Sequence, residues 1–65
     1  MIGENIRTLR RAKGWTQEKL ARKTRLTSGY ISTVELGQET ISVDNLVKIG
    51  KAMGVSFSEL VKGMD

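Results

Sequence analysis

Residues 16–37 read TQEKLARKTRLTSGYISTVELG, and this stretch decides how the chain folds. Thr16 and Thr27 each precede a run of helix-compatible residues, and a threonine hydroxyl in that position caps the first turn of a helix. Apolar residues then recur at helical spacing, first at Leu20 and Ala21 and then at Tyr30, Ile31 and Val34. The pattern predicts two short helices, at about 17–24 and about 28–36.

The connection between these two segments is only three or four residues long, and the first segment carries a small residue, Ala21, on its inner side. Two helices that cross at roughly 90–120° over so short a turn need a small side chain where their backbones approach. The spacing is therefore typical of helix-turn-helix geometry.

Helical patterns also lie on both sides of this pair. Before it, Ile2, Ile6 and Leu9 form an apolar stripe, and Gly14 provides a left-handed stop. After it, Ser42 can cap a fourth helix that Gly54 ends. The apolar positions of that fourth helix are Val43, Leu46, Ile49 and Met53.

The last pattern is Ser-Phe-Ser-Glu at residues 56–59, which is a capping box: the serine oxygen and the glutamate carboxylate each accept from the other's backbone amide. Leu60 and Val61 follow on this short helix, and Gly63 ends it. Because no stretch alternates as a strand would, we expect an all-α fold, a compact five-helix bundle in a single domain over residues 1–65.

Composition excludes several classes of function. The 65 residues include no cysteine and no histidine, which rules out a disulfide framework, a thiolate zinc site and the commonest general base. We therefore expect neither an enzyme nor a cofactor or metal. No apolar run approaches the roughly 20 residues of a membrane span. The first residues lack the order of a signal peptide, so we expect a soluble, cytoplasmic protein.

Charge is unevenly distributed along the chain. Residues 1–25 hold eight basic and two acidic residues, whereas residues 26–65 hold three basic and five acidic ones. A basic half that includes the first helix of the crossing pair favours a polyanionic partner such as double-stranded DNA over a merely solvated surface.

Three runs resemble one known family: IGENIRTLR at residues 2–10, GWTQEKLA at 14–21 and YISTVELG at 30–37. Together with the residues that follow, they are similar to the Cro-like, or Xre-type, helix-turn-helix family of phage repressors and small bacterial regulators. The resemblance implies a lambda-repressor-like bundle whose third helix lies in the DNA major groove, in a regulator associated with the nucleoid.

The resemblance also implies roles for individual residues. The base-reading candidates are Ser28, Gly29, Ser32 and Thr33. The phosphate-binding candidates are Gln17, Thr16, Thr27, Lys19, Arg25 and Tyr30. Arg10 and Glu35 match an ion pair that links the first and third helices.

Some residues depart from the family pattern. Arg25 stands where a glycine is usual, so it is either a tolerated turn residue at positive φ or an added phosphate contact. Gly29 either allows the helix to approach the groove closely or leaves selection to DNA shape. Tyr30 either donates to a phosphate or is a half-buried residue with its hydroxyl in water. The loop Gln38-Glu39-Thr40 lacks the positive charge that some relatives carry there.

Two expectations concern apolar residues. Trp15 and Met53 are expected in the core rather than at a binding site. Phe57, Val61 and Met64 gather near the last helix and could form a two-fold dimer interface.

The sequence thus indicates a sequence-specific DNA-binding repressor or controller that acts as a homodimer. The alternative is a helical protein-interaction module, such as an antitoxin-like domain, whose main partner is a protein.

Overall fold

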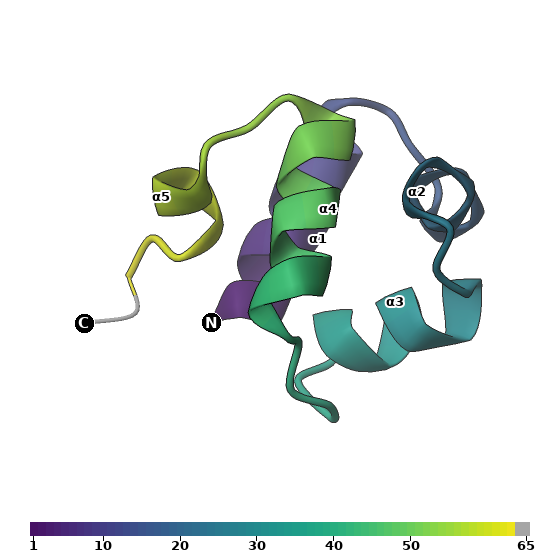
Figure 1. Cartoon of the computed structure of the whole chain (residues 1–65), viewed down its shortest axis with the longest axis horizontal. Helices are drawn as coiled ribbons and strands as arrows, with labels where there is room; N and C mark the ends of the chain where they lie inside the picture. The colour runs from purple at the N-terminus through teal and green to yellow at the C-terminus, as the bar shows by residue number, and fades with distance from the viewer. Residues whose placement is uncertain (64–65) are drawn as a thin grey trace.

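The computed structural model describes residues 1–63 and contains five helices in this range, with no strand. Their bounds are α1 Ile2–Ala12, α2 Gln17–Thr24, α3 Ser28–Glu35, α4 Val43–Met53 and α5 Phe57–Leu60. Figure 1 shows α2 and α3 together on one side of the α1 and α4 helices, with α5 on the other side. The expected all-α, five-helix fold is confirmed.

Side-chain caps set the starts of four helices. The hydroxyls of Thr16, Thr27, Ser42 and Ser56 accept from the backbone N–H three residues later, at 3.0, 3.0, 3.1 and 3.2 Å. The predicted capping box is only half formed within residues 1–63. The Ser56 oxygen does accept from the Glu59 amide, but its other contact is the Ser58 hydroxyl at 3.1 Å.

A residue in the left-handed (positive φ) backbone conformation ends each of the first four helices or the turn that follows it. Gly14, Gly37 and Gly54 have φ of 73°, 76° and 69°, and at the end of α2 the same conformation falls on Arg25, with φ of 61°. The Arg25 N–H donates to the Arg22 carbonyl and the next N–H donates to the Ala21 carbonyl, so the two orphan carbonyls are satisfied as in a glycine-ended helix.

Each of the five helices contributes to one core. Its members, all at most 5% exposed, are Ile6, Leu20, Ala21, Ile31, Val34, Leu46, Ile49, Met53 and Leu60. Met53 is therefore in the core as expected, and Ala21 is buried where α2 packs on its neighbours. Trp15 is only half-buried at the edge of the core, where the ammonium groups of Lys13 and Lys19 lie 5.8 and 5.3 Å from the ring centroid.

Two expectations about apolar residues were wrong. Val43 was placed among the apolar positions of the fourth helix, but as the first residue of α4 it is 67% exposed. Val61 was placed on the last helix, but α5 ends at Leu60 and Val61 is its C-cap residue.

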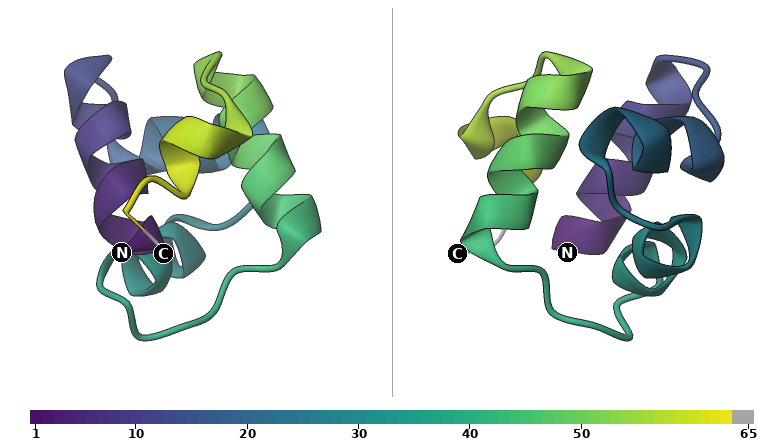
Figure 2. Two further views of the ribbon diagram at one scale, coloured as in Figure 1. Left: turned by 90° about the vertical axis from the view of Figure 1, so that its left-hand side faces the viewer. Right: turned by 45° about the vertical axis from the view of Figure 1, so that its right-hand side comes forward.

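Close backbone approaches fix how α1 meets its neighbours. Gly3 lies against the Val34 carbonyl oxygen, where a Cβ would overlap it. At the other end of the chain, the Asn5 side-chain amide donates to the Leu60 and Lys62 carbonyls, both at 2.8 Å. α1 therefore holds both α3 and the segment after α5. The loop from α3 to α4 runs in an open arc beside α3 (Figure 2).

Candidate nucleic-acid interface

α3 has one buried side and one polar side. Ile31, Val34 and Glu35 are buried, whereas Ser28 and Gly29 are exposed at the start of the helix. The other two base-reading candidates, Ser32 and Thr33, are half-buried one turn further on. The four candidates therefore lie on the part of α3 that does not face the core, and they form a surface with short side chains.

The first turns of α2 and α3 bring several of the phosphate candidates to the surface. Thr16 and Thr27 are exposed, and both hydroxyls are used as helix caps. The positive end of a helix dipole favours an anion at such a turn, so the two N-termini add to the charge of the nearby basic side chains. Arg25 is exposed in the turn between them, and Lys19 is half-buried beside Trp15.

The ion pair that the resemblance implies is present. Arg10 donates from Nε and Nη2 to the two carboxylate oxygens of Glu35, at 2.7 and 3.0 Å, and its Nη1 donates to the Trp15 carbonyl at 2.7 Å. Both residues are buried. The pair ties α1, the loop after α1 and α3 into one unit.

Gln17 joins the same network. Its Nε2 donates to Oε1 of Glu35 at 3.1 Å, and the Nε atom of Arg7 lies 3.7 Å from the same oxygen. The family resemblance implies only a phosphate contact for Gln17. The sequence gives no sign of the bond to Glu35, because the two residues are 18 positions apart. The amide has a second N–H, so the contact with Glu35 orients the side chain without using both donors.

These contacts decide the ionisation of Glu35. Burial raises the pKa of its carboxyl, but hydrogen bonds from Arg10 and Gln17 and the charges of Arg10 and Arg7 lower the pKa by more. The net result is a pKa below the ordinary glutamate value, so Glu35 is an anion at neutral pH. In turn, the hydrogen bond to Glu35 raises the pKa of the Arg10 guanidinium.

Comparison with known proteins agrees with this geometry. The helix-turn-helix family model matches residues 6–60. The chain belongs to the Xre-type helix-turn-helix family. It is a DNA-binding transcriptional regulator and not an enzyme.

Three similar proteins illustrate this membership. The control protein C.BamHI of Bacillus amyloliquefaciens is 40% identical over 62 residues, which cover 94% of this chain and 76% of the relative. An uncharacterized HTH-type transcriptional regulator of Sinorhizobium fredii is 37% identical over the whole chain and 84% of the relative. The crystal structure of the restriction-modification controller protein C.AhdI from Aeromonas hydrophila has a TM-score of 0.88 at 39% identity, over 91% of this chain and 89% of the other.

The hydroxyl of Tyr30 has a partner that neither sequence interpretation predicted. Its ring is half-buried, but its hydroxyl accepts from the Asn45 side-chain amide of α4 at 3.1 Å instead of contacting only water. The hydroxyl hydrogen is not used in that bond, so it can still be donated to a phosphate. The contact links α3 to α4, which the sequence did not predict.

The regulator also carries an exposed apolar patch, formed by Val47 of α4 and Phe57 of α5, which line one shallow pocket. Their exposed fractions are 39% and 51%. Of the two other residues expected at a dimer interface, Val61 is half-buried against the core and Met64 lies outside the described residues. Val47 was not among the residues that the sequence predicted at a dimer interface.

Two absences concern the described residues, 1–63. Within that range, no three acidic, histidine or cysteine residues gather as a metal site would require. None of the helices there has the length and apolar character to cross a membrane.

Proposed function

We propose that the regulator binds a near-palindromic operator as a homodimer, with α3 of each copy in the major groove of double-stranded DNA. The observation that carries the proposal is the division of α3 into a buried side and an uncovered polar side. Through such binding the regulator would repress or control transcription on the nucleoid. In this proposal Ser28, Gly29, Ser32 and Thr33 face the base edges.

The lack of a side chain at Gly29 supports a close approach to DNA. A Cβ built at Gly29 would meet no atom within 4 Å, so packing inside the protein does not require glycine there. Glycine in a helix is unfavourable relative to alanine by up to about 1 kcal/mol. A benefit outside the protein, such as contact between the helix backbone and the groove, would offset this cost. The methyl group of Thr27 can then pack on a thymine methyl.

Phosphate contacts would position the helix. We assign them to the first turn of α2, with Thr16, Gln17 and Lys19, and to the turn into α3, with Arg25, Thr27 and Tyr30. The bond between Gln17 and Glu35 supports this assignment, because it fixes a donor at the N-terminus of α2 in one orientation. Such contacts carry register and affinity but no sequence information.

Dimerisation through the apolar patch would give two-fold recognition. Val47 and Phe57 stay exposed in the single copy, on α4 and α5, which pack on each other (Figure 1). Burying this patch against a second copy would place the two α3 helices on one face of DNA. Half-sites in such dimers lie about 34–36 Å apart, one turn of the duplex.

The test is a sequence-selected pool of duplex DNA titrated at several salt concentrations. The logarithm of affinity should fall linearly with the logarithm of salt, by about 0.9 per phosphate neutralised. A single enriched, near-palindromic sequence is expected. Binding that does not change with salt, or a pool without an enriched sequence, would refute operator binding.

A matched pair of variants locates the contacts. Lys19→Ala should reduce the salt slope by about one unit, because one phosphate partner is lost. Lys62→Ala removes the same charge from the exposed residue after α5, away from the two helix N-termini, and should leave the slope unchanged. Equal slopes for the two variants would argue that net charge, rather than this surface, attracts the DNA.

A further inference from the structure

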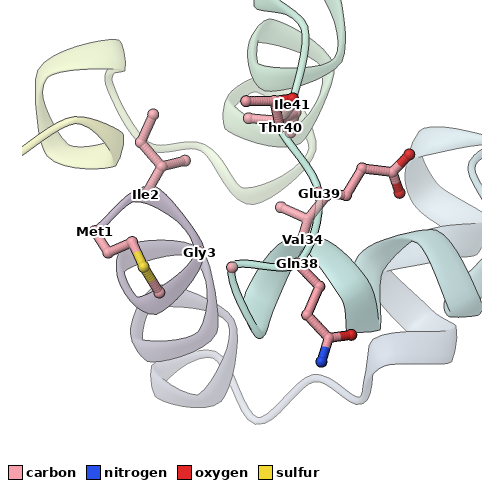
Figure 3. Close-up of a pocket in the computed structure, with 9 residues that line it drawn as sticks. Met1, Ile2, Gly3, Val34, Gln38, Glu39, Thr40 and Ile41 are labelled. Atoms are coloured by element: carbon pink, nitrogen blue, oxygen red, sulfur yellow. The ribbon is translucent and has the colours of Figure 1, made fainter.

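Glu39 contacts a base-reading candidate although it lies outside α3. Its Oε2 lies 3.1 Å from the Thr33 hydroxyl oxygen, and that hydroxyl also lies 2.9 Å from the Tyr30 carbonyl oxygen. Glu39 is exposed in the loop between α3 and α4. Figure 3 shows its side chain directed away from Met1 and Ile2, toward the side of the loop where α3 continues. The carboxylate therefore extends the polar side of α3.

Thr33 and Glu39 together can accept hydrogen bonds from a ligand but have no hydrogen left to donate. Thr33 has a single hydroxyl hydrogen, and both of its neighbours, the Tyr30 carbonyl and the Glu39 carboxylate, are acceptors. That hydrogen is therefore used within the protein. What the pair can still offer a ligand is acceptor capacity alone, from the carboxylate oxygens and the free lone pair of the hydroxyl.

No cation neutralises the carboxylate within residues 1–63. The ion pairs of this range are both made by Glu35, so Glu39 lies on the proposed DNA-facing surface as an unpaired anion. Next to a phosphate such an anion would be repelled. The partner that fits it is a hydrogen-bond donor on a base edge.

Only two groups of that kind exist in the major groove. Cytosine presents its N4 amino group and adenine its N6 amino group, whereas guanine and thymine present acceptors at N7, O6 and O4. Acidic side chains pair with cytosine in known direct readout. An acceptor-only pair at one position therefore selects an amino group and excludes a guanine or thymine edge.

We propose that Glu39 is a specificity-determining residue of the regulator. Together with Thr33 it accepts a hydrogen bond from an exocyclic amino group of a base at one base pair of each half-site. The preferred group is N4 of cytosine. This inference rests on the proposed function, since it requires α3 to lie in the major groove. It assigns sequence selection to a loop whose negative charge otherwise only weakens DNA binding.

The test repeats the selection of duplex DNA with the wild-type chain and with Glu39→Gln. A glutamine amide keeps an acceptor for Thr33 but adds a donor, so the variant can face an amino or a carbonyl edge equally well. We expect the preference at one symmetric base pair to fall by about 10-fold while the preferences elsewhere stay as in the wild type. Glu39→Ala, which leaves neither an acceptor nor a donor in the side chain, should lose the same preference.

Glu4→Gln is the matched control. Glu4 is exposed in the first turn of α1, so this change alters net charge by the same amount without touching Thr33. General affinity should rise similarly in Glu4→Gln and Glu39→Gln, and only the latter should change base preference. Thermal unfolding should keep its midpoint within about 4 °C in all variants, because the substituted side chains are exposed.

The outcomes separate this inference from the proposed function. An operator enriched by the wild type and read identically by Glu39→Gln would overturn the role of Glu39 and leave operator binding intact. The same holds if both glutamine variants gain affinity without any change in base preference. A wild-type chain that enriches no sequence would overturn both proposals.

Discussion

Arg10 of α1 meets Glu35 of α3 with two parallel hydrogen bonds, 2.7 and 3.0 Å long, and both side chains are buried. The guanidinium and the carboxylate are planar forks that match each other, so this pair fixes orientation as well as distance. Glu35 is the last residue of α3. Gln17, the first residue of α2, donates a hydrogen bond to the same carboxylate. One buried anion thus sets the relative positions of three helices.

Removing one partner of the pair should be strongly destabilising. Arg10→Met would leave the Glu35 carboxylate buried with only Gln17 and the more distant Arg7, and we expect a loss of roughly 3–5 kcal/mol in the free energy of unfolding. Urea unfolding measures it. The double variant Arg10→Met with Glu35→Met should lose less than Arg10→Met alone, because no charge stays buried. A double variant that is less stable than the single one would contradict this account.

Stability should also depend on pH through Glu35. Its folded pKa is below the ordinary value, so the folded state binds its proton less readily than the unfolded state. The stabilisation is therefore fully present above the unfolded pKa of about 4.3, and it is lost as the pH falls through the lower folded pKa. Unfolding free energies of the wild type and Glu35→Gln, compared between pH 7 and pH 2, should converge at the acidic end. A constant difference would argue against the shift.

Arg25 should trade stability for DNA binding. Its φ of 61° is the left-handed conformation, which costs a residue with a side chain about 1–2 kcal/mol. Arg25→Gly should remove that cost. Glycine also gives the unfolded chain more conformational freedom, which offsets part of the gain, so the net stabilisation of the fold should be about 0.5–1 kcal/mol. The same variant should bind operator more weakly, with a salt slope lower by about one unit. Arg25→Lys keeps charge and backbone strain, so both measurements should stay near wild type.

Two glycines should respond in opposite ways to alanine. Gly3→Ala would force a methyl group onto the Val34 carbonyl oxygen and separate α1 from α3, with a loss of about 1–3 kcal/mol. Gly29→Ala meets open space and should stabilise α3 by up to about 1 kcal/mol. If Gly29 serves close approach to the groove, its alanine variant should nevertheless bind operator less tightly. Thermal unfolding and operator titration together measure both effects.

Phe57 should control association of the regulator. Replacing a side chain that becomes buried in a dimer loses about 1.5–3 kcal/mol of apolar transfer energy, so Phe57→Ala should weaken dimerisation by about 10- to 100-fold. Sedimentation with and without operator duplex measures it. Leu36→Ala truncates a side chain that is equally exposed, 53% against 51%, outside the patch. It should leave the dimer unchanged, and equal effects of the two variants would contradict an interface at Phe57.

Local sequence was enough to predict where four of the helices begin. A hydroxyl at Thr16, Thr27, Ser42 or Ser56 satisfies an amide three residues away, and such a bond depends on the nearest neighbours alone. The positive φ at Arg25 agrees with one of the two interpretations that followed from the family resemblance, in which glycine is usual at this position. Apolar periodicity did not distinguish the exposed Val43 from the buried residues later in α4, since it records spacing and not burial.

Contacts between residues far apart in the chain had no local signal. The bonds from Gln17 to Glu35 and from Asn45 to the Tyr30 hydroxyl join different helices, so only the packing of those helices brings the atoms within reach. The sequence by itself determined the five helices, the caps of four of them and most residues of the core, because these follow from short-range bonding and apolar spacing. The tertiary structure alone decided which polar side chains are bonded to residues far away in the chain. It therefore also decided which of them stay free for DNA, since hydrogen-bonding capacity at a surface depends on every neighbour in space.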